Sequence, residues 1–123
     1  MELQGFKDLI VYRKSYKLAL DIFEITKEFP KEEKFSLTDQ IRRSSRSIPT
    51  NIAESWAKRL YIKAFVSKIS DALGEEYETE VWLSMSHDMQ YISSDTYFQL
   101  SSGYDEIRRM LISILNTPEK FCK

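Results

Sequence analysis

The chain has 123 residues, of which 42% are hydrophobic and 30% are charged, and its formal net charge is −1. This length suits one domain with one core, extending from residue 1 to residue 123. The near-zero charge excludes a global attraction to nucleic acid, and three glycines and three prolines are few turn residues for a β-sandwich or barrel. We therefore expect a single all-α domain.

Cysteine content and hydropathy indicate the compartment. Cys122 is the only cysteine, so no internal disulfide can form, which is typical of a reducing environment. The first nine residues, MELQGFKDL, lack the apolar core of a secretory signal, and no apolar run approaches the roughly 20 residues of a membrane span. These features predict a cytoplasmic protein with no membrane partner.

A first helix is predicted from Phe6 to Phe29, because apolar residues recur there at helical spacing until Pro30 stops the pattern. The apolar residues form two adjacent stripes, so we expect this helix to contact more than one neighbour. One stripe contains Phe6, Leu9, Ile10, Tyr16, Ala19, Leu20 and Phe23, and the other contains Val11, Leu18, Ile22, Ile25 and Phe29.

A second helix is predicted to begin at Leu37, where the Ser36 hydroxyl is available to cap a free amide. At 100° per residue, one face of this helix is apolar or small. That face contains Leu37, Ile41, Ser44, Ile48 and Ile52. Pro49 lies inside the helix, where a proline removes one backbone hydrogen bond at a cost of about 3 kcal/mol or more.

The end of the second helix is poorly marked, because residues 55–62 contain no glycine or proline. One long helix from Leu37 to about Gln90 is therefore an alternative. Such a helix would be unusually long for a small domain, so we place a break between Lys58 and Tyr61.

Two further helices complete the predicted fold. The third runs from about Ile62 to Met89 and contains Gly74, which costs about 1 kcal/mol relative to alanine and which we interpret as a site of close packing. Its apolar stripe contains Phe65, Ile69, Ala72, Leu73, Tyr77, Val81 and Ser84. The fourth begins at residues 93–95, ends before Pro118, and has a stripe of Tyr97, Leu100, Tyr104, Ile107, Leu111 and Ile114. Short connections favour an antiparallel up-down four-helix bundle.

Charge is segregated along the chain. Residues 40–70 carry seven basic residues and one acid, a net charge of +6, whereas residues 71–90 carry six acids and no lysine or arginine. Arg42, Arg43 and Arg46 lie nearly opposite the apolar face of the second helix, so we predict that they face solvent or a partner. Two interpretations stay open. The arginines form a phosphate-binding patch, or they form a solvated face paired with acids of a neighbouring helix or subunit.

The residue inventory argues against an enzyme. His87 is the only histidine, and Ser84 lies three residues before it, so the Glu-x-x-His pairs of di-metal bundles are missing. Glu76 and Glu80 lie one turn apart, and we interpret them as acidic surface or an ion-pair interface rather than a metal- or proton-sharing pair. No glycine-rich phosphate loop or nucleophile motif is present. We predict no catalytic residue, no metal and no cofactor.

Several motifs carry a family resemblance over nearly the whole chain. They are Phe6-Lys7-Asp8-Leu9, the stretch Leu37 to Ser44 (LTDQIRRS), the stretch Ser47 to Glu54 (SIPTNIAE), Ala72-Leu73-Gly74, and Tyr77 to Glu80 (YETE). In this order they resemble the bacterial four-helix-bundle proteins encoded in intervening sequences of 23S ribosomal RNA genes, sometimes labelled S23 ribosomal proteins. The accessory variability proteins of diversity-generating retroelements are similar. The structural residues of the shared motif are Gln40, Ser47, Pro49, Asn51 and Glu54.

The resemblance implies an antiparallel bundle that forms a ring-like homo-oligomer, with a pentamer as the expected state. It does not imply a ribosomal component. In the retroelement relatives, a basic surface engages nucleic acid and a reverse transcriptase. The residues at corresponding positions here are Arg42, Arg43, Arg46, Lys58 and Arg59, and Lys63 would extend this surface.

Two functional hypotheses follow. In the first, a non-enzymatic oligomer binds RNA or DNA through phosphate contacts, without strong sequence specificity because no base-reading motif is present. Asn51 would then bond backbone groups near Pro49, and Glu54 would pair with a basic side chain across a subunit boundary. In the second, the protein is an interaction scaffold in which the basic second helix docks on the acidic third helix of the next subunit.

Overall fold

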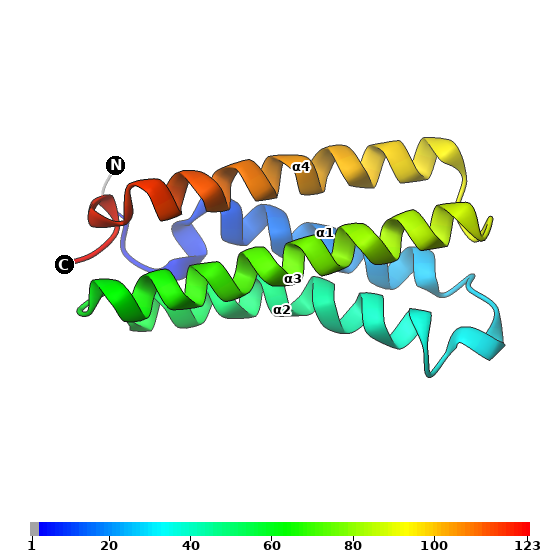
Figure 1. Cartoon of the computed structure of the whole chain (residues 1–123), viewed down its shortest axis with the longest axis horizontal. Helices are drawn as coiled ribbons and strands as arrows, with labels where there is room; N and C mark the ends of the chain where they lie inside the picture. The colour runs from blue at the N-terminus through cyan, green and yellow to red at the C-terminus, as the bar shows by residue number, and fades with distance from the viewer. Residues whose placement is uncertain (1–2) are drawn as a thin grey trace.

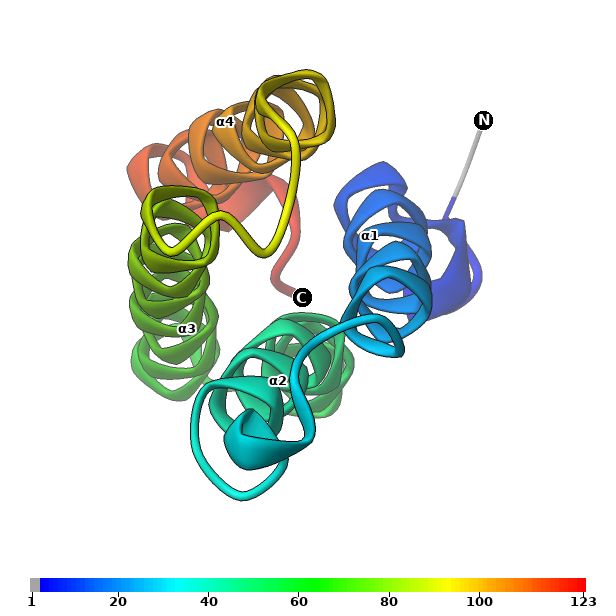
Figure 2. The same cartoon turned by 90° about the vertical axis from the view of Figure 1, so that its right-hand side faces the viewer.

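A computed structural model, which describes residues 3–123, shows four long helices that run alternately in opposite directions (Figure 1). The helices are α1 (Ile10–Thr26), α2 (Leu37–Ala57), α3 (Ile62–Asp88) and α4 (Ser94–Asn116), with short 3-10 turns η1 (Phe6–Asp8), η2 (Lys31–Glu33) and η3 (Pro118–Lys120). Seen from the end, each helix lies beside the next in the chain, and α4 lies beside α1 (Figure 2). This is the all-α, antiparallel up-down bundle that the sequence predicts. No helix within these residues is long and apolar enough to cross a membrane.

The helix boundaries confirm one prediction and correct another. The first predicted helix is interrupted at Leu9, whose extended backbone separates η1 from α1. The break after the second helix lies where the sequence places it, since α2 ends at Ala57 and α3 begins at Ile62. A single long helix to Gln90 is therefore excluded.

The start of α2 is capped by a carboxylate rather than by the predicted serine. Glu33 accepts a hydrogen bond from the Leu37 amide at 3.3 Å, and the Ser36 hydroxyl donates to the same carboxylate. Hydrogen bonds from Ser36 and Tyr91 lower the pKa of Glu33. An ionised carboxylate at a helix N-terminus is favourable because it complements the helix dipole. The prediction that Ser36 itself caps the helix is wrong.

The core confirms the predicted faces of α2 and α4 and corrects those of α1 and α3. The buried face of α2 includes Ile41, Ile48 and Ile52, as predicted. In α1, Val11 and Ile22 of the second stripe are buried in the core, whereas Tyr16 and Leu20 of the first stripe are about half exposed. The wide apolar arc of α1 therefore has one face toward the bundle and one face toward solvent.

The predicted stripe of α3 follows the core only as far as Ala72. Beyond that point Tyr77 and Val81 are exposed, and the buried positions are Glu76, Thr79, Leu83 and Ser86. The buried positions along α3 alternate in steps of three and four, which is the 3.5-residue period of a packed bundle. The predicted stripe instead follows steps of four from Leu73 through Tyr77 to Val81. It therefore leaves the buried face of the helix.

Gly74 also lies on the exposed side of α3. No atom lies within 4 Å of the position that a Cβ would occupy there. The prediction of close packing at this glycine is therefore wrong within the chain.

Helices α2 and α3 approach each other over small polar residues. The Thr79 hydroxyl of α3 hydrogen-bonds the Ser44 hydroxyl of α2 at 2.8 Å, and both side chains are fully buried. Small side chains at a helix contact allow the two axes to lie close together. Each hydroxyl also lies within hydrogen-bond distance of a carbonyl of its own helix, Ser44 of Ile41 and Thr79 of Glu75, so their mutual contact favours one register of α2 against α3 through its geometry.

Among residues 3–123, Glu76 is the only aspartate, glutamate, lysine, arginine or histidine that is fully buried. Neither carboxyl oxygen has a hydrogen-bond partner there, and the buried Tyr104 hydroxyl also has none. Burial raises the pKa of Glu76 to about 9, with the neighbouring Glu80 adding to the shift and Arg108 opposing it. The interpretation of Glu76 as acidic surface is wrong, while Glu80 does form an ion pair, with Arg108 at 3.0 Å.

Glu76→Gln is predicted to remove a large part of the pH dependence of stability. The folded protein retains the Glu76 proton up to about pH 9, whereas the unfolded carboxyl releases it near its ordinary pKa of 4.5. The free energy of unfolding therefore decreases as pH rises between these values. The amide does not ionise, so at about pH 8 the variant should be more stable than the parent by on the order of 1–3 kcal/mol. Below about pH 4.5 the two should be nearly equal.

Urea denaturation followed by circular dichroism at several pH values measures this difference, with Glu28→Gln as the control for an exposed glutamate. A parent protein that gains no stability relative to the Glu76→Gln variant as the pH is lowered would contradict the prediction.

Candidate functional site

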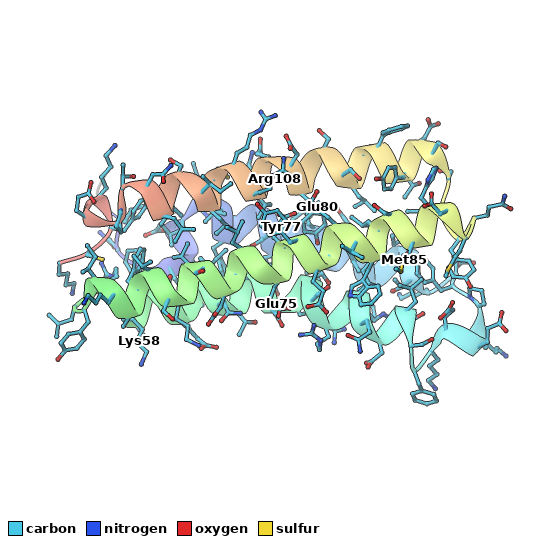
Figure 3. All side chains as sticks on the ribbon, viewed as in Figure 1. Lys58, Glu75, Tyr77, Glu80, Met85 and Arg108 are labelled. Atoms are coloured by element: carbon cyan, nitrogen blue, oxygen red, sulfur yellow. The ribbon has the colours of Figure 1, made fainter. Side chains whose placement is uncertain are left out.

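The six predicted cations occupy two separate places on the bundle. Arg42, Arg43 and Arg46 lie in the first half of α2, and the other three lie at the turn between α2 and α3. The twelve residues from Arg46 to Lys58 correspond to about 18 Å of helix at 1.5 Å per residue. Figure 3 shows Lys58 at one end of the molecule. The structure therefore separates the predicted patch into two basic sites.

Arg42 holds α2 against α1. Its Nε donates a hydrogen bond to the Thr26 hydroxyl at 2.7 Å, and its Nη2 donates to the Phe23 carbonyl at 3.4 Å. The guanidinium also lies over the Phe23 ring, with its carbon 4.7 Å from the ring centroid. Because α1 ends at Thr26, Arg42 places a positive charge at the C-terminal end of that helix, where the dipole favours it. Arg42 is therefore partly buried against α1, which makes it less exposed than the sequence predicts, although it still lines the surface.

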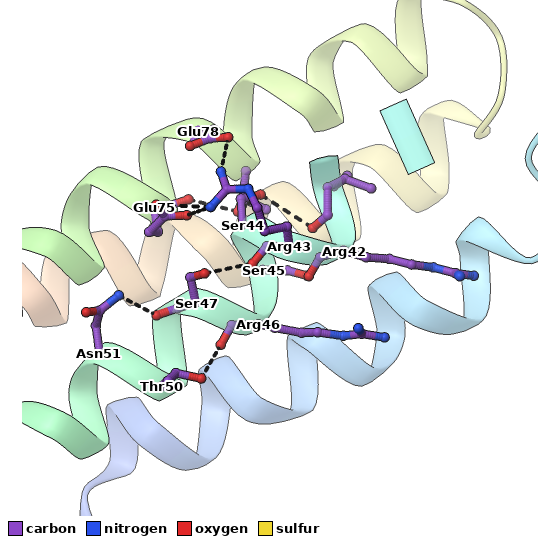
Figure 4. Close-up of polar contacts among 12 residues, drawn as sticks. Arg42, Arg43, Ser44, Ser45, Arg46, Ser47, Thr50, Asn51, Glu75 and Glu78 are labelled. Atoms are coloured by element: carbon purple, nitrogen blue, oxygen red, sulfur yellow. Dashed lines mark hydrogen bonds and ion pairs between the residues drawn. The ribbon is translucent and has the colours of Figure 1, made fainter. Parts of the chain in front are cut away.

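Arg43 connects α2 to α3. Its guanidinium pairs with Glu75 at 3.1 Å and also with Glu78. Figure 4 shows this side chain turned toward the two glutamates. The hydrogen bond to Glu78 raises the pKa of Arg43, and the same bond lowers the pKa of Glu78. The basic second helix and the acidic third helix therefore meet within one chain.

Arg46 is the arginine that remains available. Its side chain is exposed and extends beside Arg42 over α1, with its guanidinium carbon 5.9 Å from the Phe23 ring centroid (Figure 4). Within residues 3–123, no carboxylate lies within ion-pair distance of Arg46 or Arg42. Arg46 is therefore the strongest candidate on α2 for contact with an anionic partner.

A surface hollow surrounds these arginines and adds a residue that the sequence analysis missed. Its lining is Lys34, Phe35, Thr38, Asp39, Arg42, Arg43, Arg46, Ser47, Thr50, Asn51 and Glu54. Lys34 adds to the hollow a cation without an ion pair in residues 3–123, and two carboxylates also line it, Asp39 and Glu54, of which Glu54 pairs with Lys68. Lys34 precedes α2 and lies outside the helical pattern that the sequence analysis follows. Its position one turn before the start of α2 is the sequence signal that would have identified it. We call Lys34 and Arg46 the α2 basic site.

The second site lies at the turn between α2 and α3. Arg59 donates a hydrogen bond from Nε to the Trp56 carbonyl at 3.0 Å and stacks on the Trp56 ring at 3.5 Å. Lys58 and Lys63 are exposed beside it. None of the three has a carboxylate within ion-pair distance in the described part of the chain. We call Lys58, Arg59 and Lys63 the turn basic site.

The motif around Pro49 is structural. Pro49 is buried, and α2 continues through it to Ala57. Side chains bond backbone carbonyls one turn back on both sides of the proline, as serine, threonine and asparagine readily do. Ser47 bonds the Arg43 carbonyl at 2.9 Å, Thr50 bonds the Arg46 carbonyl at 2.8 Å, and Asn51 bonds the Ser47 carbonyl at 2.8 Å.

The two remaining motif residues lie on either side of this segment. Glu54 pairs with Lys68 of α3 at 2.9 Å, so its partner belongs to the same chain rather than to a neighbouring subunit. Gln40 is half-buried.

Comparison with known proteins places the chain in a family. The family model of the 23S rRNA-intervening sequence protein matches residues 7–113. The chain belongs to this family. A crystal structure of a protein with unknown function from the S23 ribosomal protein family of Bacteroides thetaiotaomicron VPI-5482 is 34% identical, with a TM-score of 0.79. The match covers 88% of this chain and 96% of that one. No curated protein matches the chain.

In this 23S rRNA-intervening sequence family protein, Arg42 and Arg46 should differ in their contribution to stability. Arg42→Ala is predicted to lower the free energy of unfolding by about 1–2 kcal/mol, because it removes charge-assisted hydrogen bonds at the end of α1. Arg46→Ala should lower it by less than about 0.5 kcal/mol. Chemical denaturation of both variants measures the difference, and equal losses would contradict the structural role of Arg42.

Proposed function

We propose that this protein is a non-enzymatic, homo-oligomeric bundle that binds RNA or DNA through phosphate contacts. The α2 basic site and the turn basic site supply the positive charge. Guanidinium and ammonium groups without a carboxylate partner can neutralise phosphates and release bound counterions. Neither site contains a base-reading motif, so the expected binding is largely independent of sequence.

One observation carries this proposal. Five of the six cations predicted from the sequence have no carboxylate partner within residues 3–123, and Arg43 is the exception. Of the twelve other lysines and arginines, seven form ion pairs, as when Lys14 pairs with Glu106 and Arg109 with Asp105, and five form none within residues 3–123 (Lys7, Lys31, Lys34, Lys120 and Lys123). The net charge of −1 therefore hides a local excess of positive charge on α2 and its following turn.

The spacing of the two basic sites suggests how one strand would contact both. About 18 Å of helix separates Arg46 from Lys58. In duplex DNA this corresponds to about five phosphate steps of 3.4 Å along one strand. We infer that oligonucleotides long enough to reach both sites bind more tightly than shorter ones.

Reversing charge at both sites is predicted to weaken binding. The triple variant Lys34→Glu, Lys58→Glu, Lys63→Glu should lose at least about tenfold in affinity for RNA and DNA oligonucleotides at low salt. The binding constant of the parent should also decrease steeply as salt concentration rises. Fluorescence anisotropy with labelled single strands and duplexes measures both effects. Arg42 and Arg43 are left unchanged because they hold α2 to α1 and α3.

The matched control is Arg109→Glu, which reverses an exposed charge on α4, away from both sites. A parent that binds no better than the triple variant at low salt would overturn the nucleic-acid proposal.

A second candidate function is a protein-interaction scaffold. The observation in its favour is the number of large apolar side chains left exposed on α1 and α3, since such patches commonly mark protein contacts. The charge pattern of the sequence suggests that basic α2 docks on acidic α3 of the next subunit. This charge-based contact is weakened because Arg43 already binds Glu75 and Glu78 of its own chain. Self-association would then depend mainly on apolar surfaces.

Sedimentation velocity over about 1–100 μM protein tests the oligomeric part of the proposal. This range detects dissociation constants of about 1 μM, which correspond to an association free energy of about −8 kcal/mol. The expected species is larger than the 14.6 kDa chain, and a pentamer would have five times that mass. A single 14.6 kDa species at every concentration would show that the protein does not self-associate.

A further inference from the structure

The first feature is an apolar groove between α1 and α2. It is lined by Phe6, Tyr12, Tyr16, Ala19, Leu20, Phe23, Arg46, Pro49, Thr50 and Ala53, and its volume is about 630 Å³. Tyr16 and Leu20 are 50% and 51% exposed. These side chains belong to the first predicted apolar stripe, most of which the bundle leaves partly or largely exposed. A surface of this kind is costly to leave in water, since each fully buried large apolar side chain gains about 1.5–3 kcal/mol.

The second feature is an apolar ridge on α3. Tyr77, Val81, Met85 and Met89 follow one another at intervals of four residues, and each is between 42% and 52% exposed. Figure 3 shows Tyr77 and Met85 along this helix. Residues at this spacing form one stripe on a helix surface. The stripe lies outside the buried face of α3 and has no covering element in the described part of its own chain.

The charges beside the two features are opposite in sign. Arg42 and Arg46 lie at the Phe23 end of the groove and have no carboxylate partner in residues 3–123. On α3, Asp88 follows Met85 by three residues, and its side chain is 80% exposed. Its single ionic neighbour in the described chain is His87, at 3.3 Å. A cationic groove end and an anionic ridge end are complementary.

The dimensions of the groove and the ridge also agree. From Tyr77 to Met85 the ridge extends about 12 Å, and from Tyr16 to Phe23 the groove extends about 10 Å, at 1.5 Å of rise per residue. An amphipathic helix docks in such a groove through anchors one turn apart. Helices α1 and α3 lie at opposite corners of the bundle in the end view, so one copy has both surfaces free at the same time (Figure 2).

We propose that the groove between α1 and α2 of one copy binds the α3 ridge of a second copy. Tyr77, Val81 and Met85 enter the groove, and Asp88 lies toward Arg46. This inference rests on the proposed self-association and specifies its surfaces. The contact is heterologous, because each copy contributes a groove on one side and a ridge on the other, so successive contacts build a ring or an open filament.

Thiol cross-linking between two single-cysteine variants tests this pairing. In a Cys122→Ser background, one protein carries Leu20→Cys in the groove and the other carries Val81→Cys on the ridge. Both positions are exposed, so both variants should fold, and circular dichroism verifies this. With a short bis-maleimide, the mixture should give a covalent dimer, and either variant alone should give at least about tenfold less, because like faces do not meet in a heterologous contact.

The control replaces Leu20→Cys by Leu60→Cys, which is exposed at the α2–α3 turn outside the groove and should not cross-link to Val81→Cys. Two results would overturn the groove–ridge contact while leaving self-association intact. In the first, the protein is oligomeric but Leu20→Cys does not cross-link to Val81→Cys. In the second, Val81→Cys cross-links to itself. A monomer in sedimentation overturns both this inference and the oligomeric proposal, while nucleic-acid binding is judged separately by anisotropy.

A charge exchange provides a second, independent measurement. Arg46→Asp and Asp88→Arg should each shift the association constant toward monomer, and the double variant should recover association because each contact again joins opposite charges. Recovery supports the pairing of Arg46 with Asp88, and a double variant no better than the single ones contradicts it.

Discussion

The packing of α2 against α3 is the constraint on which the rest of the structure depends. The buried Ser44–Thr79 hydrogen bond favours one register, and the pairs Arg43–Glu75 and Glu54–Lys68 hold the same two helices along their exposed edge. Exposed ion pairs contribute little individually, about 0–1 kcal/mol, so the apolar contacts between the helices supply most of the stability. The ion pairs have a different consequence, because Arg43 and Lys68 bind carboxylates of their own chain and are then less available to an anionic partner.

This packing determines which cations are left for function. Three arginines close together in sequence have three different roles: Arg42 binds the end of α1, Arg43 binds α3, and Arg46 has no carboxylate partner within the described residues. The excess positive charge therefore concentrates at two sites rather than over the whole of α2. The apolar residues are divided in a similar way, because α1 and α3 each bury one face and leave a second one exposed.

Much of the fold follows from periodicity, and the failures have physical causes. The buried faces of α2 and α4 are predictable because each helix has a single apolar stripe. In α1 the sequence offers two stripes, and only the tertiary packing selects the one with Val11 and Ile22. In α3 a glutamate occupies a core position, so a search for apolar residues passes over Glu76 and follows Tyr77 instead. The partners of Arg42 and Arg43 lie 16 or more residues away, and local sequence contains no signal for them.

The division of the arginines can be observed directly by solution NMR of their Nε–Hε groups during titration with a short single-stranded RNA. The account predicts that the Arg46 resonance shifts on binding, while the Arg42 and Arg43 resonances, held by Thr26 and by Glu75 and Glu78, stay nearly unchanged. An Arg43 resonance that shifts as much as that of Arg46 would show that RNA displaces the contact with α3, and would contradict the account.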